Sequence, residues 1–336
     1  MPECASRIKA VKFYLARMDH DQIKRESAYD WGRQHHELLP LVEQWDNYFV
    51  TQPSGEDNPH LALDLVEPAL WRLSNLESVL LTWTECPWTI EEPKGWFDDE
   101  ISVDLAGEEP LNVQRAVINV LRRHKVPLKS LTIEPLKLQM LTLLPSVLDD
   151  LVETSFGTLT QLHLGVEGNE LAGENRLENF ILLMPLLREL QIHAFRNSWR
   201  PLDGQFLPNT HLSHLESLDL FDALLCLDGF ASFLVSHCST LKHVALRSMR
   251  GLVDSSRPSS LTWELIFALM NERLEKLETV NIIGFFSQKD ERNRVEFTWI
   301  ILRGNGLNLE NYVESSKVER YILEGGQCPR LNWGVR

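Results

Sequence analysis

The stretch Leu215-Glu-Ser-Leu218-Asp-Leu220 carries the pattern that decides how this chain folds. Apolar residues stand at its first, fourth and sixth positions. One polar residue separates Leu218 from Leu220, which is the alternation of a β-strand that buries one of its faces. The stretch therefore predicts a short strand with Leu218 and Leu220 in the core and Asp219 on the opposite face.

The same pattern recurs along the chain. Its seven occurrences are Leu76-Val79-Leu81, Leu128-Leu131-Ile133, Leu159-Leu162-Leu164, Leu187-Leu190-Ile192, Leu215-Leu218-Leu220, Leu241-Val244-Leu246 and Leu277-Val280-Ile282. Their first residues are separated by 52, 31, 28, 28, 26 and 36 positions. The middle spacings match leucine-rich repeats, in which each unit is one short strand and a return helix stacked on its neighbours. The larger gaps indicate insertions or a missed unit.

Weaker matches extend the series to both ends of the chain. Ile8-Val11-Phe13 predicts a preceding strand, and Val318-Tyr321-Leu323 predicts a closing strand. Helical periodicity fills the stretches between strands. The predicted helices cover residues 113–121, 177–184, 228–238 with Asp228 as N-cap, and a helix that starts at Ser260 or Thr262 and runs to Met270.

Leucine-rich helices of an all-α protein offer an alternative, because a 3.6-residue period also brings residues three apart together. Against it, the third apolar residue stands only two positions further on, and the pattern recurs through six consecutive gaps. We therefore expect an α/β fold, an irregular right-handed leucine-rich-repeat solenoid with a parallel concave β-sheet and helices on the convex side. The expected domains are an N-terminal strand and helical cap region (1–75), the solenoid (76–323) with an insertion (84–110), and a C-terminal tail (324–336).

Composition narrows the classes of partner. Hydrophobic residues make up 43% of the 336 and charged residues 24%, which is the balance of an ordinary globular protein. The net charge of −15 disfavours nucleic acid and membrane surfaces as partners.

The five cysteines form no Cys-x-x-Cys pair, the N-terminus lacks an apolar signal-peptide core, and no apolar run reaches the length of a spanning helix. We expect a cytoplasmic or nuclear protein.

One part of the chain resembles a known family. After Leu215–Leu220 come Leu227-Asp-Gly-Phe230 and then His237-Cys238-Ser-Thr-Leu241-Lys-His-Val244-Ala-Leu246. This order is similar to the cysteine-containing repeat of F-box proteins, particularly the degenerate type abundant in fungi, where a Cys ends the helix three residues before the next strand's first Leu. The stretch Val318–Pro329 also resembles the terminal strand and Gly-Gly turn of such proteins, so the resemblance covers about residues 70 to 335.

The chain departs from this family in two ways. The Asn or Cys that normally follows each strand is replaced by Thr84, Leu136, Glu167, Phe195, Ala223, Met249 and Phe285. No F-box is recognisable, the helical module with a Leu-Pro start that binds the adaptor of an SCF-type ubiquitin ligase. Residues 1–60 instead predict a strand and one amphipathic helix around residues 38–45. Either the module is lost or it lies upstream of Met1.

Sequence motifs for catalysis are absent. The chain has no Gly-x-Ser-x-Gly elbow, Walker loop, Gly-x-Gly-x-x-Gly or His-Glu-x-x-His. Adjacent helical residues point about 100° apart, so His35 and His36 do not suit one metal ion, and solvated surface histidines are the simpler interpretation. We expect no enzyme activity, no cofactor and no metal.

Strand geometry predicts a binding face instead. If the leucines point into the core, the alternate residues face outward on the concave sheet. They form three rows: Ser130, Gln161, Glu189, Ser217 and His243; Thr132, His163, Gln191, Asp219 and Ala245; Glu134, Gly165, His193, Phe221 and Arg247. His163 and Asp219 lie two strands apart, almost 10 Å at about 4.8 Å per strand, so they do not form a catalytic dyad. Phe221 and Arg247 are of the types enriched at interface hot spots, although a merely solvated face is an equal alternative for any single residue.

The insertion at residues 84–110 is a second candidate surface. It holds nine acidic residues against Lys94, with Trp88 and Trp96 among them. Insertions in repeat arrays map to loops and often to binding faces. An acidic, aromatic loop suits a basic peptide; the alternative is that the tryptophans pack over the solenoid edge and the charges are solvated.

The sequence is compatible with three functions. The first is a scaffold resembling the substrate-recognition repeats of an F-box protein, with a protein partner on the concave face and an SCF adaptor on any upstream F-box. The second is a freestanding leucine-rich-repeat interaction protein with no ubiquitin role. The third, a hydrolase or transferase, needs perturbed titratable groups in one pocket, which the three rows do not supply.

Overall fold

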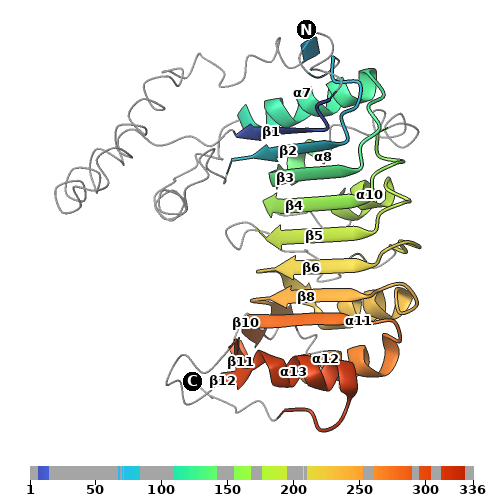
Figure 1. Cartoon of the computed structure of the whole chain (residues 1–336). Helices are drawn as coiled ribbons and strands as arrows, with labels where there is room; N and C mark the ends of the chain where they lie inside the picture. The colour runs from blue at the N-terminus through green and yellow to red at the C-terminus, as the bar shows by residue number, and fades with distance from the viewer. Residues whose placement is uncertain are drawn as a thin grey trace, which may run out of the picture. The chain divides into compact units, whose positions relative to one another are not determined.

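The computed structural model describes residues 7–14, 67–68, 70, 72–83, 109–141, 155–167, 176–194, 207, 210–252, 261–289, 295–303 and 312–329 (Figure 1). The chain divides into two compact units. Unit 1 comprises Met1–Leu128 with Thr132–Pro135, and unit 2 comprises Lys129–Leu131 with Leu136–Arg336. The predicted helix around residues 38–45 and the insertion that holds Trp88 and Trp96 lie outside the described residues.

Unit 1 contains strands β1 (Ala10–Tyr14) and β2 (Ser78–Thr82) and helix α7 (Glu109–Arg123). The two strands pair in parallel, from Ala10 opposite Ser78 to Tyr14 opposite Thr82, so the strand predicted from Ile8-Val11-Phe13 is confirmed. The predicted helix at 113–121 is also confirmed. Gln114 of this helix is fully buried and its side-chain amide donates to the Pro135 carbonyl at 2.7 Å, which satisfies the amide N–H inside an apolar layer.

Unit 2 is built on a mainly parallel sheet. Its principal strands are β3 (Ser130–Lys137), whose central residues belong to unit 1, β4 (Gln161–Glu167), β5 (Glu189–Ala194), β6 (Ser217–Phe221), β8 (His243–Arg247), β10 (Thr279–Lys289), β11 (Val295–Leu302) and β12 (Tyr312–Glu314). They neighbour one another in this order. The pairs β4–β5, β5–β6, β6–β8, β8–β10 and β11–β12 are parallel, and β10–β11 is antiparallel. The strands predicted from Leu159 to Ile282 are confirmed.

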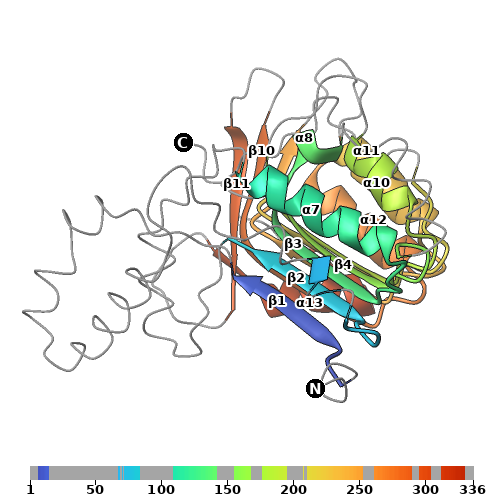
Figure 2. The ribbon, with the colours of Figure 1, turned by 90° about the horizontal axis from the view of Figure 1, so that it is seen from above.

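Helices cover one face of this sheet. They are α8 (Leu138–Leu141), α10 (Arg176–Leu182), α11 (Leu227–Ser236) and α12 (Trp263–Arg273), while α13 (Ser315–Glu324) packs against β10 and α12. Figure 2 shows α8, α10 and α11 on the same side of β3 and β4. The motif leucines point toward these helices and are almost completely buried, as Leu190, Leu218 and Leu220 illustrate at 0–1% exposure. Among the described residues, unit 2 is therefore an α/β unit whose helices leave one face of the sheet, the open face, uncovered.

The same backbone hydrogen bonds recur at the start of successive strands. One carbonyl accepts two consecutive N–H groups of the next unit: Lys129 from residues 160 and 161, Thr160 from 188 and 189, Arg188 from 216 and 217, Glu216 from 242 and 243, and Lys242 from 278 and 279. All these N···O distances lie between 2.8 and 3.0 Å. Since each bond sets the next strand's starting point, the repetition keeps the motif leucines in register.

A second repeated feature follows the carboxyl ends of β6 and β8 and recurs at the equivalent point inside β10. Asp222, Ser248 and Gly284 each come four residues after the motif's middle apolar residue, and each has a positive φ, of 57°, 52° and 100°. The Asp222 N–H donates to the Arg247 carbonyl at 2.8 Å, and the Ser248 N–H donates to the Ile283 carbonyl at 3.0 Å. The left-handed residue redirects the chain into a second, short parallel ladder of β7 (Leu224–Cys226), β9 (Arg250–Leu252) and the second half of β10.

The prediction of a closing strand at Val318-Tyr321-Leu323 is wrong, because these residues lie in helix α13. Val318 and Ile322 are both buried and stand four residues apart, so a helix places both on its buried face. The strand pattern in this stretch is weak, and burial of this helical face favours the helix. The Asn271 side chain of α12 donates to the Ile322 carbonyl at 3.0 Å and ties the helix to its neighbour. Helix α13 thus packs against β10 and α12, where another strand was expected.

Two predicted helix starts have different outcomes. Thr262 is the N-cap of α12, and its hydroxyl accepts the Leu265 N–H at 3.3 Å, as one of the two predicted starts requires. Helix α11 begins at Leu227 with Cys226 as N-cap, so the prediction of Asp228 as N-cap is wrong. Asp228 lies instead in the first turn, where its charge favours the positive end of the helix dipole.

Candidate protein-binding face

The predicted outward rows are the rows of the open sheet face. Gln161, Glu189, Ser217 and His243 stand opposite one another across β4, β5, β6 and β8. His163, Gln191, Asp219 and Ala245 form the next row, and Gly165, His193, Phe221 and Arg247 the third. Ser130, Thr132 and Glu134 lie on β3. The side chains alternate with buried leucines, as the motif predicts, and most of them are half-buried rather than free in solvent.

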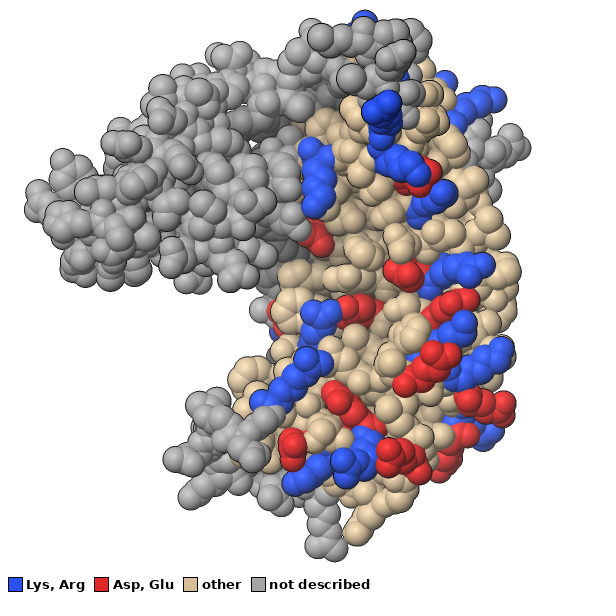
Figure 3. Space-filling model, in the orientation of Figure 1, with Lys and Arg blue, Asp and Glu red and all other residues tan. Residues whose placement is uncertain are grey.

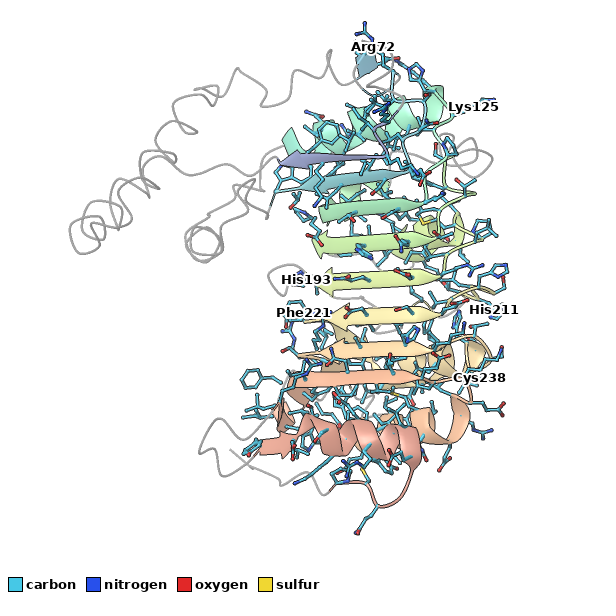
Figure 4. The ribbon with its side chains drawn as sticks, in the orientation of Figure 1. Arg72, Lys125, His193, His211, Phe221 and Cys238 are labelled. Atoms are coloured by element: carbon cyan, nitrogen blue, oxygen red, sulfur yellow. The ribbon has the colours of Figure 1, made fainter. Side chains whose placement is uncertain are left out.

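An aromatic pair occupies the carboxyl ends of β5 and β6. The rings of His193 and Phe221 stack with centroids 4.5 Å apart and an angle of 24° between their planes, and Figure 4 places both side chains at neighbouring strand ends. Phe221 remains 36% exposed. A large apolar ring that is held by a neighbour and still open to solvent is the type of side chain that anchors protein interfaces.

A salt bridge crosses the face diagonally. The guanidinium of Arg247 on β8 donates through Nη2 to Oδ2 of Asp219 on β6, and the sequence rows did not predict this pair. The other carboxylate oxygen of Asp219 is buried without a hydrogen-bond partner among the described residues. Farther from this pair, the Gln161 amide donates to Glu189 at 3.0 Å. The carboxylates of the central face are thus engaged with neighbours on the sheet.

His163 and Asp219 form no hydrogen bond in the described residues, as the two-strand separation predicts. Burial lowers the pKa of His163, while the charges of Glu189 and Asp219 act in the opposite direction. Burial also lowers the pKa of His193, and the nearby Arg247 lowers it further. Both imidazoles are therefore neutral at pH 7, and they offer the face polar groups without added charge.

Residues missed by the sequence rows extend the face beyond β8. Thr279, Asn281 and Ile283 of β10 stand opposite His243, Ala245 and Arg247. The seventh motif, Leu277-Val280-Ile282, already implied that these alternate residues face outward, but the rows stopped one strand short. Arg303, whose Nη2 donates to the Asn281 side chain at 2.9 Å, follows an antiparallel strand outside the repeat, so no sequence signal pointed to it.

Charges of both signs lie on this side of unit 2, which Figure 3 shows with acidic and basic side chains interspersed. In the described part of the chain, no three His, Cys, Asp or Glu residues are grouped so that they could hold a metal ion. Within the same residues, no helix has both the length and the apolar composition needed to cross a bilayer. The face offers stacked rings, amides and guanidinium groups, which are types of group that occur in protein–protein interfaces.

Three histidines make the stability of the fold depend on pH. His237 is fully buried; its Nε2 accepts the Leu212 N–H at 2.9 Å, and burial lowers its pKa, as it does for His163 and His193. Because the folded state holds these imidazoles neutral, the unfolded chain binds more protons below its own pKa of about 6.5. The stabilisation is fully present above that pH and is lost progressively as pH falls from it through the lower pKa of the folded state. We expect the urea concentration at the unfolding midpoint to decrease when the pH is lowered from about 7.5 to about 5.5.

A double variant assigns this pH dependence. The double variant His163→Gln with His193→Gln removes two of these three imidazoles, the two that lie on the open face. The decrease in the urea midpoint between the two pH values is therefore expected to become smaller. His214→Gln, at an exposed position, serves as the matched control. Equal midpoints of the unaltered protein at the two pH values would contradict the prediction.

No protein-family model matches this chain, and searches of curated proteins and of solved structures likewise gave no match.

Proposed function

We propose that this protein is a non-enzymatic scaffold built on a leucine-rich-repeat solenoid, and that it binds a protein partner on the open face of unit 2. The observation that carries the proposal is the exposed, stacked Phe221 beside Arg247 on that face. The recurring strand-entry bonds and the left-handed residues at equivalent positions support the repeat interpretation. Hot spots in protein interfaces are enriched in aromatic and arginine side chains of this kind.

The resemblance to F-box proteins gives the partner a role. In that role the partner is a substrate protein, and the repeats present it to an SCF-type ubiquitin ligase. The alternative is a freestanding interaction protein on the same fold, with no ubiquitin role. Copurification of an SCF adaptor with the protein isolated from its native cells separates the two: recovery supports the ligase role, and partner binding without the adaptor supports the freestanding scaffold.

Site-specific photocrosslinking tests the face itself. A photoreactive residue at Gln191, on the open face, is expected to capture a discrete partner, whereas the same residue at the exposed Leu265 of α12 is not. The double variant Phe221→Ala with Arg247→Ala should lower capture by about thirtyfold or more, because one such hot-spot truncation alone costs about 2 kcal/mol. Its circular dichroism spectrum should be unchanged. Capture from Leu265 alone would place the binding surface on the helical side instead.

A further inference from the structure

We propose that the position above Ala245 on the open face binds a carboxylate of an acidic peptide segment, with an aromatic residue of the same segment on Phe221. The inference rests on the proposed function, because it names the partner chemistry for the same face. Ala245 stands between Asp219 of β6 and Asn281 of β10. Its methyl group is smaller than the side chains of both neighbours, and each neighbour holds an arginine.

Two guanidinium groups flank this position. Arg247 is held by Asp219 on one side, and Arg303 is held by Asn281 on the other. The two anchoring strands are about 10 Å apart, twice the usual strand spacing. A guanidinium carries five N–H groups. In the described residues each arginine makes the contact above through Nη2, and the Nε of Arg247 is buried, so the remaining Nη N–H groups are the donors left for a ligand. Both arginines thus keep donors for a ligand that lies between them, over the methyl group of Ala245.

The local charge favours an anion. Two arginines stand against the single carboxylate of Asp219 around Ala245, in a chain whose net charge is −15. The rows hold two further carboxylates: Glu189 is on β5 and accepts a hydrogen bond from Gln161, and Glu134 is on β3, farther along the sheet. The next side chain on β8 is His243, whose Nδ1 is 2.8 Å from the Thr279 hydroxyl. Paired guanidinium groups bind carboxylates with short, charge-assisted hydrogen bonds.

The aromatic requirement follows from the register. Phe221 lies one strand and two residues away from Ala245, a distance of about 8 Å at ordinary strand geometry. An extended peptide advances about 3.3 Å per residue, so residues two apart are separated by about 6.6 Å, and the length of the two side chains covers the remaining 1–2 Å or so. We therefore infer a partner motif in which one residue separates an aromatic side chain from Asp or Glu.

Fluorescent ten-residue peptides test the motif on the full-length protein. Peptides carrying Phe-x-Glu are expected to bind about tenfold more tightly than Phe-x-Gln or Phe-x-Lys peptides, and binding should weaken with added salt. Moving the Glu four residues from the Phe should also weaken binding. Equal affinity for the Glu and Gln peptides, or preference for Lys, overturns the proposal. A peptide that binds only when phosphoserine replaces Glu overturns the carboxylate assignment.

Variants locate the site. Ala245→Leu fills the position without changing charge, and Arg303→Met removes one guanidinium; each should lower affinity for the Phe-x-Glu peptide by about tenfold. Arg188→Met is the matched control, since Arg188 pairs with Glu216 at the opposite ends of the strands. If open-face crosslinking captures a partner while the peptide series is flat, the inference fails and the proposed function stands. If both experiments are negative, both fail.

Discussion

Replacement of Trp263 by alanine is expected to lower the free energy of unfolding by about 3–5 kcal/mol. Trp263 opens helix α12, is fully buried, and contacts three aromatic rings: Phe286 at a centroid distance of 5.1 Å, Phe267 at 6.2 Å and Phe230 at 6.4 Å. Its indole N–H donates to the Ser287 carbonyl at 3.1 Å. Truncation leaves a large cavity at the junction of α11, α12 and β10 and removes the hydrogen bond to the Ser287 carbonyl, and both losses are costly.

Urea unfolding followed by far-ultraviolet circular dichroism measures this loss without depending on the tryptophan that is removed. Trp263→Phe is the matched control, because it keeps an aromatic ring and removes the N–H donor. Its loss should be distinctly smaller than that of the alanine variant. A loss below about 1 kcal/mol for Trp263→Ala would show that the aromatic cluster contributes little to the core.

The second large effect is expected at Gly284, where an alanine should destabilise the fold by about 2–4 kcal/mol. Gly284 has a φ of 100°, a backbone angle that residues other than glycine rarely adopt. An added Cβ would also collide with Ser248, whose hydroxyl and backbone nitrogen occupy that space, the nitrogen at 2.9 Å. Because the neighbour is partly backbone, it cannot move aside without disturbing the link between β8 and β10.

Gly326→Ala separates the two causes. Gly326 has a similar φ of 105°, but a Cβ there would meet nothing within 4 Å. The difference between the two variants therefore measures the collision alone, and it should be about 1–3 kcal/mol. Thermal unfolding and urea titration provide the comparison. Equal losses for the two variants would mean that backbone strain, rather than close packing, accounts for the effect at Gly284.

The rows of the open sheet face were predictable from the sequence, whereas the contacts between its side chains were not. The pattern around Leu218 and Leu220 places Asp219 and Phe221 outward, and the parallel register confirms their rows. The diagonal pair between Asp219 and Arg247 was not predictable, because the motif specifies which face a side chain occupies and not the direction in which a long side chain extends. Arg303 reaches the face from an antiparallel strand outside the repeat.

Local periodicity alone predicted the motif strands from Leu159 to Ile282 and the helices α10, α11 and α12, since alternating burial leaves a direct trace in residue order. It did not predict the short strands β7 and β9. It failed at Val318–Leu323, where packing on α12 and β10 selects a helix for a stretch compatible with either structure. The left-handed residues Asp222 and Ser248 likewise depend on the carbonyls of neighbouring strands. Features that one strand determines can be read from the sequence, whereas those that need a partner from another segment are decided only when the chain packs.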